Sequence, residues 1–360
     1  MSSSLRLNFF GSAPFVLPLL ESIHLHRGRV LSELAREQLA QIPLAEQEAH
    51  HITANLLESP YLQDPLELVC VVTQPDRENR GRVVRNKIAQ YCLDNNIPLF
   101  QPGKMRAQVE EYLAQPRADL GIVAAYGQIL PMPVVEAQRY GLLNWHPSLL
   151  PEYRGPTPIQ SALRDKRTHT GLSWIKVDEQ MDAGDIYWQS EYRVQPRDTF
   201  LTLANHFASL GANQWALVLA LRILDREQAA GEYAPRRQKY SDVTFCSLLH
   251  KTDRFVDPRA LTAVELDAHY RAYLDFPGTV YTSDYFRGDV KLVEVEGVVS
   301  ASEFEKLHQE VSSLGVFDEW VRVSIGKQVK TLLKTKDGFL SVTKLGLSSG
   351  KQITLSGYQF

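Results

Sequence analysis

The chain has 360 residues, which at about 150 residues per domain corresponds to two domains. Hydrophobic residues make up 44% and charged residues 22% of the chain, a balance that supplies a core and excludes disorder, collagen and a disulfide scaffold. The formal net charge of −3 argues against nucleic-acid binding by bulk electrostatics, but it allows local basic patches.

Targeting and redox signals are weak. No run of about 18 apolar residues predicts a membrane span, and the N-terminal residues enter a strand pattern without the charged and apolar regions of a secretory signal. Cys70, Cys92 and Cys246 lie far apart and have no metal-binding spacing. We therefore expect reduced thiols, a cytoplasmic location and no metal or membrane partner.

The first two thirds of the chain alternate between strand and helix patterns. A strand over Leu5–Phe10 is followed by a turn at Gly11–Pro14 and a helix over Phe15–Ile23. Further strands are predicted at Leu66–Thr73, Ile97–Phe100, Ala118–Ala125, Leu142–Asn144 and Thr170–Val177, with helices over Val84–Asn95 and from Pro133. Strands that are apolar on both faces and alternate with helices predict an α/β fold with a Rossmann-like, mostly parallel sheet. In such sheets, ligands bind beyond the carboxyl ends of the strands.

Two stretches interrupt this pattern. The segment from about residue 24 to residue 64 is rich in Leu, Ala, Glu and Gln, and it predicts a helical insertion of unknown role. Residues 228–244 are predicted to be a linker. Beyond it, a helix over Thr262–Leu274 and several short strands predict a smaller β-barrel of the OB type at residues 245–360.

The end of this second domain is basic. From Arg322 onward it carries seven basic residues and one acid, Asp337; the basic residues are Arg322, Lys327, Lys330, Lys334, Lys336, Lys344 and Lys351. A lysine-rich face is consistent with a polyanionic partner. Solvated lysines on edge strands are the alternative.

Candidate catalytic residues follow the Leu142 strand. Because alternate side chains of a strand share a face, Asn144 and His146 are expected to point together into the crevice, and Gly184 permits a tight turn beside Asp182. An amide donor, an imidazole and a carboxylate suit acyl or formyl transfer to an amine, which is its own nucleophile. Each residue alone has a structural alternative, since an Asp before Gly is often a turn former. His146 lacks the further His or Cys ligands that zinc needs.

Two motifs make a family resemblance visible. The run Asn-Trp-His-Pro-Ser-Leu-Leu-Pro-Glu-Tyr-Arg-Gly at 144–155 and Asp-Ala-Gly-Asp-Ile at 182–186 resemble the signature of the folate-dependent formyltransferases. Four other stretches, at residues 10–12, 73–77, 125–131 and 155–160, resemble the branch that formylates methionyl-tRNA. The resemblance covers most of residues 5–225, whereas the carboxy-terminal third is similar only in layout.

The resemblance implies a reaction and a set of roles. The donor would be 10-formyltetrahydrofolate and the acceptor the α-amino group of methionine on initiator tRNA, in translation initiation. Residues 1–227 would be the formyltransferase catalytic domain and residues 245–360 a tRNA-binding barrel of a monomeric enzyme. Asn144, His146 and Asp182 would be catalytic, and the folate site would contain Ser148, Leu149, Leu150, Pro151, Tyr126 and Gly127.

The resemblance also assigns the acceptor site. Phe15 would help to hold the methionine side chain. The basic segment Arg77–Lys87 matches the loop that lies against the tRNA acceptor stem, and its cations are Arg77, Arg80, Arg82, Arg85 and Lys87. Five cations in eleven residues also suit phosphate contacts on physical grounds.

Three alternatives differ in substrate or class. A nucleotide-amino-sugar N-formyltransferase would share the three catalytic residues, but it would not need the basic segment. A glycinamide ribonucleotide formyltransferase lacks an attached second domain. A catalytically silent RNA-binding module would have no need of all three catalytic residues.

Overall fold

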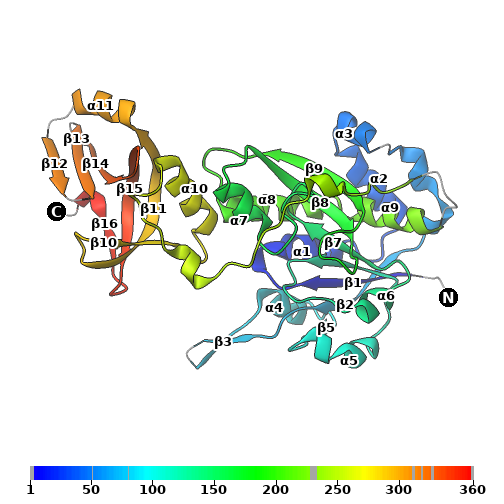
Figure 1. Cartoon of the computed structure of the whole chain (residues 1–360). Helices are drawn as coiled ribbons and strands as arrows, with labels where there is room; N and C mark the ends of the chain where they lie inside the picture. The colour runs from blue at the N-terminus through cyan, green and yellow to red at the C-terminus, as the bar shows by residue number, and fades with distance from the viewer. Residues whose placement is uncertain are drawn as a thin grey trace. The chain divides into compact units, whose positions relative to one another are not determined.

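The computed structural model describes residues 4–50, 52–79, 81–227, 233–309, 313–317, 319–325 and 328–357 (Figure 1). The chain divides into two compact units. The first contains Met1–Pro158, His169–Arg193 and Thr202–Cys246, and the second contains Ile159–Thr168, Val194–Leu201 and Ser247–Phe360. Each unit is thus assembled from separate stretches, whereas the sequence analysis assigned each domain one continuous stretch.

A seven-stranded sheet forms the centre of the first unit. Its strands, in spatial order, are β5 (Leu99–Phe100), β2 (Leu66–Val72), β1 (Leu5–Gly11), β6 (Leu120–Ala124), β7 (Leu142–His146), β8 (His169–Lys176) and β9 (Ile186–Arg193). The first five are parallel, and β8 and β9 add to β7 as antiparallel strands. The chain leaves β1 toward β2 and returns to β6 on the other side of β1. The topological switch point, where such sheets bind ligands, therefore lies between β1 and β6.

Helices cover both faces of this sheet, as the buried apolar side chains of the strands require. They are α1 (Leu17–Leu25), α4 (Lys87–Asp94), α5 (Val109–Leu113), α6 (Met132–Glu136), α8 (Phe200–Ala212) and α9 (Trp215–Glu227). Phe10 and Leu142 pack in one core cluster with Tyr112 and Val134, which come from α5 and α6. Trp145 faces the other side, where its Nε1 donates to the carbonyl oxygen of Phe207 in α8.

The predicted insertion is helical and part of the first unit. It contains α2 (Leu31–Ala40), α3 (Leu44–Ala49) and two short 3₁₀ turns, and α2 packs along α9. Oε1 of the buried Gln38 accepts hydrogen bonds from the backbone N–H groups of Ala216 and Leu217, at 2.8 and 3.1 Å. Gln38 therefore satisfies two amides at the start of α9 that have no partner within that helix. The insertion supports the sheet's helical layer.

A second sheet, wholly antiparallel, forms the centre of the second unit. Its strands are β10 (Thr279–Ser283), β11 (Gly288–Ser300), β15 (Gly338–Leu347), β14 (Gln328–Lys334), β13 (Trp320–Ile325) and β12 (Ser313–Phe317), with β16 (Gln352–Thr354) paired to β15. Helix α10 (Ala263–Tyr273) begins with a capping box between Thr262 and Glu265 and packs on β11. The structure also contains α7 (Pro158–Arg164) and α11 (Ala301–Gln309).

These features confirm the predicted fold class, a Rossmann-like, mostly parallel sheet with a smaller β domain at the carboxyl end. Among the residues described, none of the helices taken singly has the length and apolar composition to cross a membrane. Helices α8 and α9 reach that composition only as a pair bent by 57°. Both lie against the core of the first unit, where α9 buries its residues from Trp215 to Leu224.

Candidate active site

Strand β7 ends at the carboxyl edge of the sheet and carries two polar side chains there. Leu142 and Trp145 face opposite sides of the sheet, so Asn144 and His146 share the face of Leu142, as the predicted strand alternation requires. His146 is 4% exposed, and Asn144 is half-buried. Both therefore occupy a site with restricted access to water.

The loop between β8 and β9 supplies the carboxylate. Asp182 has φ = 51°, in the left-handed region that Asp tolerates better than most residues. Two residues later, a Cβ on Gly184 would lie 1.9 Å from the carbonyl oxygen of Lys176, so this position requires glycine. The loop thus folds back tightly over the end of β8 and turns Asp182 toward β7.

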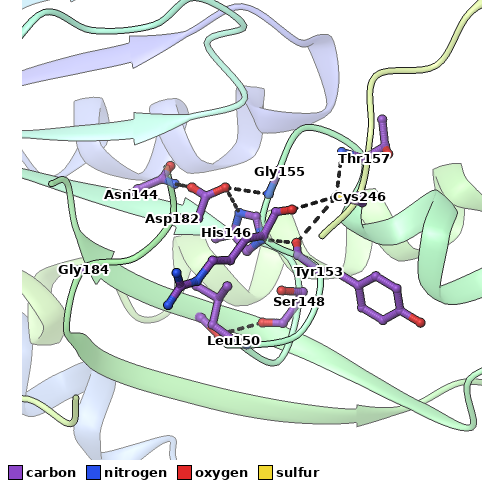
Figure 2. A network of polar contacts seen from close by, with 12 residues as sticks. Asn144, His146, Ser148, Leu150, Tyr153, Gly155, Thr157, Asp182, Gly184 and Cys246 are labelled. Atoms are coloured by element: carbon purple, nitrogen blue, oxygen red, sulfur yellow. Dashed lines mark hydrogen bonds and ion pairs between the residues drawn. The ribbon is translucent and has the colours of Figure 1, made fainter. Parts of the chain in front are cut away.

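The structure brings Asn144, His146 and Asp182 together (Figure 2). Asn144 Nδ2 donates to Asp182 Oδ1 at 3.0 Å, and His146 Nδ1 lies 3.6 Å from Asp182 Oδ2. The latter separation is longer than a hydrogen bond, so an N–H at Nδ1 is not committed to the carboxylate. The Asp182 side chain is 13% exposed. The cluster therefore offers an amide donor, an imidazole and an ionisable carboxyl group within reach of one small ligand.

Backbone groups of the 147–155 loop complete the cluster. His146 Nε2 lies 3.0 Å from the carbonyl oxygen of Tyr153, and the N–H of Gly155 donates to Asp182 Oδ2 at 2.8 Å. Oxygen atoms thus lie near both ring nitrogens of His146, within hydrogen-bond distance at Nε2 and beyond it at Nδ1. A Cβ on Gly155, whose φ is 122°, would lie 2.2 Å from the carbonyl oxygen of Cys246. This glycine lets two chain segments approach closely beside Asp182.

Four of the six residues predicted for the folate site, Ser148, Leu149, Leu150 and Pro151, form the first part of the same loop. The Ser148 hydroxyl is buried and donates to the carbonyl oxygen of Glu152, and Leu150 is 2% exposed beside Ile175. Leu149 and Pro151 are half-buried. The side chains of Ser148 and Leu150 therefore support the loop from inside.

Tyr126 and Gly127 follow β6, one of the two strands that border the switch point. The Tyr126 ring is 2% exposed and packs against Phe10, and burial raises the pKa of its hydroxyl. Gly127 lines a hollow of about 410 Å³. The hollow's other lining residues are Gln74, Gly103, Lys104, Met105, Arg106, Gln128 and Ile129. Lys104 and Arg106 are exposed and give its rim a positive charge.

Phe15 lies in a 3₁₀ turn, Pro14–Val16, directly after β1. Its ring centroid is 6.2 Å from that of Trp145, which separates Asn144 from His146 in the chain. The half-buried Phe15 side chain thus contacts the strand that carries two of the three polar residues.

The predicted basic segment is a two-stranded hairpin of β3 (Arg77–Asn79) and β4 (Arg82–Val84). Arg77 pairs with Val84, and Asn79 with Arg82, so Arg77 and Arg82 extend from the same face. Arg77, Arg82, Arg85 and Lys87 are exposed, and Arg85 forms an ion pair with Asp76 at 3.3 Å. Arg80 lies outside the described residues.

Segment 236–246, most of which falls in the predicted linker, also belongs to the site. Arg236 exchanges two backbone hydrogen bonds with Ile186, and Cys246 donates its N–H to the carbonyl oxygen of Arg154. The composition of this segment gave no signal of such contacts, because its partners in the first unit lie 47 to 93 residues away in sequence.

Comparison with known proteins identifies the family to which this chain belongs. A model of the formyl transferase family matches residues 44–221. A methionyl-tRNA formyltransferase from Fusobacterium nucleatum is 30% identical over 80% of the chain and 87% of its own length. Another from Chloroflexus aurantiacus is 36% identical over 65% of the chain and 74% of its own length, and one from Caldicellulosiruptor saccharolyticus is 26% identical over 85% and 94%.

Solved structures share the fold at low sequence identity. An N-formyltransferase from Helicobacter canadensis, crystallised with folinic acid and dTDP-3-aminofucose, has a TM-score of 0.53 at 15% identity and covers 94% of this chain and 98% of its own. HypX from Aquifex aeolicus also gives a TM-score of 0.53 at 15% identity, over 98% of this chain and 46% of its own. The family model and these relatives confirm the resemblance drawn from the sequence motifs: the chain is an enzyme of the formyl transferase family, and the three relatives described above are methionyl-tRNA formyltransferases.

Proposed function

We propose that the protein transfers the formyl group of 10-formyltetrahydrofolate to the α-amino group of methionine on initiator methionyl-tRNA. The observation that carries the proposal is the convergence of Asn144, His146 and Asp182 in one cluster of polar side chains. The chain's relative from Fusobacterium nucleatum is named for this reaction. In cells this reaction would take place in the cytoplasm, at translation initiation.

The cluster suits attack by an amine on a formyl carbon. As the new C–N bond forms, negative charge develops on the formyl oxygen, and the Asn144 amide and a protonated His146 would stabilise it. Asn144 Nδ2 keeps one N–H free of its bond to Asp182, and the 3.6 Å gap leaves an N–H at His146 Nδ1 available. Asp182 would hold His146 in its charged form and help to pass the amine's proton to the leaving nitrogen as the old C–N bond breaks.

The switch-point side of the site supports folate binding. The bound folate would supply the formyl group. The hollow beside Gly127 would accept part of it, and the positive charges of Lys104 and Arg106 on its rim would suit the glutamate carboxylates of a folate. The 148–151 loop, supported from inside by Ser148 and Leu150, would form the wall next to Asn144.

The exposed hairpin supports a nucleic-acid acceptor. Arg77 and Arg82 on one face of β3–β4 would contact phosphates of the tRNA, and the basic strands of the second unit would provide further contacts. Described lysines there include Lys330 and Lys334 in β14 and Lys344 in β15. Phe15, beside Trp145, would contact the methionine side chain.

A single assay tests which substrate accepts the formyl group. Purified protein is incubated with 10-formyltetrahydrofolate and either methionine-charged initiator tRNA or a nucleotide 4-amino-sugar, and formylated product is quantified. Formylation of the charged tRNA alone supports the proposal. Formylation of the sugar alone would replace it with the alternative of a nucleotide-sugar N-formyltransferase, whose solved relatives share the fold.

A further inference from the structure

The segment Arg236–Cys246 joins the two loops that form the candidate active site, and we name it the strap. At its start, Arg236 bonds to Ile186, the first residue of β9, through N–H···O contacts of 2.8 and 2.9 Å. At its end, the N–H of Arg154 donates to Thr244 at 2.9 Å and the N–H of Cys246 donates to Arg154 at 2.8 Å. The strap thus bonds to Ile186, four residues after Asp182, and to Arg154, directly before Gly155, and the chain continues from it into the second unit at Ser247.

One side chain of the strap connects the two loops. Gln238 Nε2 donates to the carbonyl oxygens of Asp182 and Gly184, both at 2.8 Å. Its Oε1 accepts from Arg154 Nε and Nη2, at 3.0 and 2.8 Å. The carboxamide uses both N–H donors and its oxygen at once, a set of contacts that carboxylate, hydroxyl or apolar side chains cannot reproduce.

Gln238 contacts the backbone at Asp182, where φ is in the left-handed region. Asp182 has a positive φ, and Gln238 holds its carbonyl oxygen together with that of Gly184, so the orientation of the whole turn depends on the amide. On the other side, Arg154 is 4% exposed, and a buried guanidinium needs hydrogen-bond acceptors. Gln238 provides two of its contacts.

The neighbours of these groups are the catalytic candidates. Arg154 lies between Tyr153, whose carbonyl oxygen faces His146 Nε2, and Gly155, whose N–H donates to Asp182 Oδ2. Tyr153 is also held by the strap, because its N–H donates to Thr244 Oγ1 at 2.8 Å. A shift of either loop would therefore change the distance between His146 and Asp182.

We propose that Gln238 is a positioning residue for formyl transfer, which fixes the Asp182 turn against the Arg154 loop so that Asp182 and His146 keep their catalytic separation. The proposal rests on the catalytic roles proposed above for these two residues. Gln238 itself contacts neither substrate, and it acts through the backbone of Asp182.

The first test compares Gln238→Ala with the matched control Ser241→Ala. Ser241 lies in the same strap and is exposed, and its hydroxyl donates to the carboxylate of the neighbouring Asp242. For Gln238→Ala we expect kcat for charged tRNA to fall about 10- to 100-fold, since a misplacement of about 1 Å can cost that much, with little change in the KM for the folate. Ser241→Ala should retain wild-type kcat. Wild-type kcat in Gln238→Ala would overturn the proposal.

A second variant, Gln238→Glu, separates a loss of positioning from a loss of folding. Gln238→Glu cannot donate to Asp182 and Gly184, and its second oxygen is repelled by their carbonyl oxygens, so kcat should fall. It retains an acceptor for Arg154 and adds an ion pair with it, which should keep the protein folded; Tm checks this. If Gln238→Glu has wild-type kcat, or if the loss of kcat in both variants matches the fraction of unfolded protein, the positioning role is wrong.

A double-mutant cycle separates positioning from general support. If Gln238 acts through Asp182, adding Gln238→Ala to Asp182→Asn should lower kcat little further. An equal loss in both backgrounds would mean that Gln238 acts independently of Asp182.

Hydrogen exchange provides a readout that does not depend on activity. The Gly155 amide should exchange faster in Gln238→Ala than in wild type, because its acceptor Asp182 Oδ2 is no longer fixed; unchanged exchange would contradict the proposal. A wild-type protein that formylates neither acceptor would instead contradict the proposed function, so the two failures are distinguishable.

Discussion

The backbone N–H of Gly155 donates a hydrogen bond to the Asp182 carboxylate, with 2.8 Å between the nitrogen and Oδ2. This contact links the two sequence motifs that carry the family resemblance. Its geometry requires a residue without a Cβ, because the Gly155 backbone also passes close to the Cys246 carbonyl oxygen. The contact therefore couples the local fold of the 147–155 loop to the position of the candidate catalytic carboxylate.

Gly155→Ala should lower both stability and activity. Its φ of 122° is a region that only glycine adopts readily, and the new Cβ would overlap the Cys246 carbonyl oxygen. We expect a loss of at least about 2 kcal/mol in the free energy of unfolding, measured by urea titration, and a loss of kcat in the folded fraction. Gly28→Ala is the control, since Gly28 has φ = 80° but no atom within 4 Å of an added Cβ. Equal effects in the two variants would show that close approach to Cys246 is unimportant.

The hairpin prediction concerns tRNA affinity. Arg77→Ala combined with Arg82→Ala should raise the KM for charged tRNA about tenfold or more and leave the KM for the folate unchanged, because both side chains lie on the same exposed hairpin face. The slope of log affinity against log salt should fall by about 2, one for each lost phosphate contact. The control Arg36→Ala removes an exposed charge from α2. A parallel rise in the folate KM would contradict the assignment of the hairpin.

Gln38 should contribute to stability without affecting catalysis. Replacement by Ala leaves the amides of Ala216 and Leu217 without their buried acceptor, so the free energy of unfolding should fall by about 1–2 kcal/mol at unchanged kcat. Gln41→Ala, at an exposed position just after α2, should change it by less than about 0.5 kcal/mol. Chemical denaturation of the wild type, Gln38→Ala and Gln41→Ala measures the two changes in unfolding free energy. Equal stability of Gln38→Ala and wild type would show that Gln38 does not stabilise the start of α9.

Alkaline pH should destabilise the first unit through its buried thiols. Burial raises the pKa of Cys70 from 9.0 to about 11 and that of Cys92 from 9.0 to about 12. Above pH 9 the unfolded chain therefore loses thiol protons that the folded chain keeps. Stability should be unaffected by these groups below pH 9 and should fall as the pH rises from 9 toward 11 or 12.

The variant with Cys70→Ala and Cys92→Ala checks this explanation. Its loss of unfolding free energy between pH 8.5 and about pH 10.5 should be smaller than that of the wild type when both are measured by denaturant titration. An identical pH dependence would assign the alkaline loss to other groups. Cys246 serves as the unchanged thiol in both proteins.

Much of the fold followed from local pattern. The apolar runs that become β1, β2, β6 and β7 were predicted near their observed positions, because strands buried on both faces have an unmistakable composition. The antiparallel β9 and the helices α8 and α9 were not predicted. Strand β9 mixes polar and aromatic residues at the edge of the sheet. Helix α9 is buried on all sides from Trp215 to Leu224, so its sequence is a nearly continuous apolar run rather than an alternation of an apolar and a polar face.

Part of the candidate site could also be predicted from local sequence patterns. Asn144, His146 and Asp182 lie in short motifs whose residue types indicate their chemistry, and the structure places them together. Gln238 contributes through a side-chain contact with the backbone of Asp182, 56 residues away in sequence, and Tyr153 contributes its carbonyl oxygen rather than its side chain. Such contacts depend on tertiary structure, so the composition of residues 228–244 indicated only a linker.

The central claim is that Asp182, with His146 and Asn144, forms the catalytic centre for formyl transfer to methionyl-tRNA. Asp182→Asn tests it most directly, because Asn also tolerates the positive φ of this position and retains a side-chain oxygen and a similar shape. The measurement is single-turnover formylation of charged initiator tRNA, with Tm as the check on folding. The account predicts an unchanged Tm within a few degrees and a rate lowered by about 10²–10⁴-fold. A folded Asp182→Asn protein with near wild-type turnover would contradict the account.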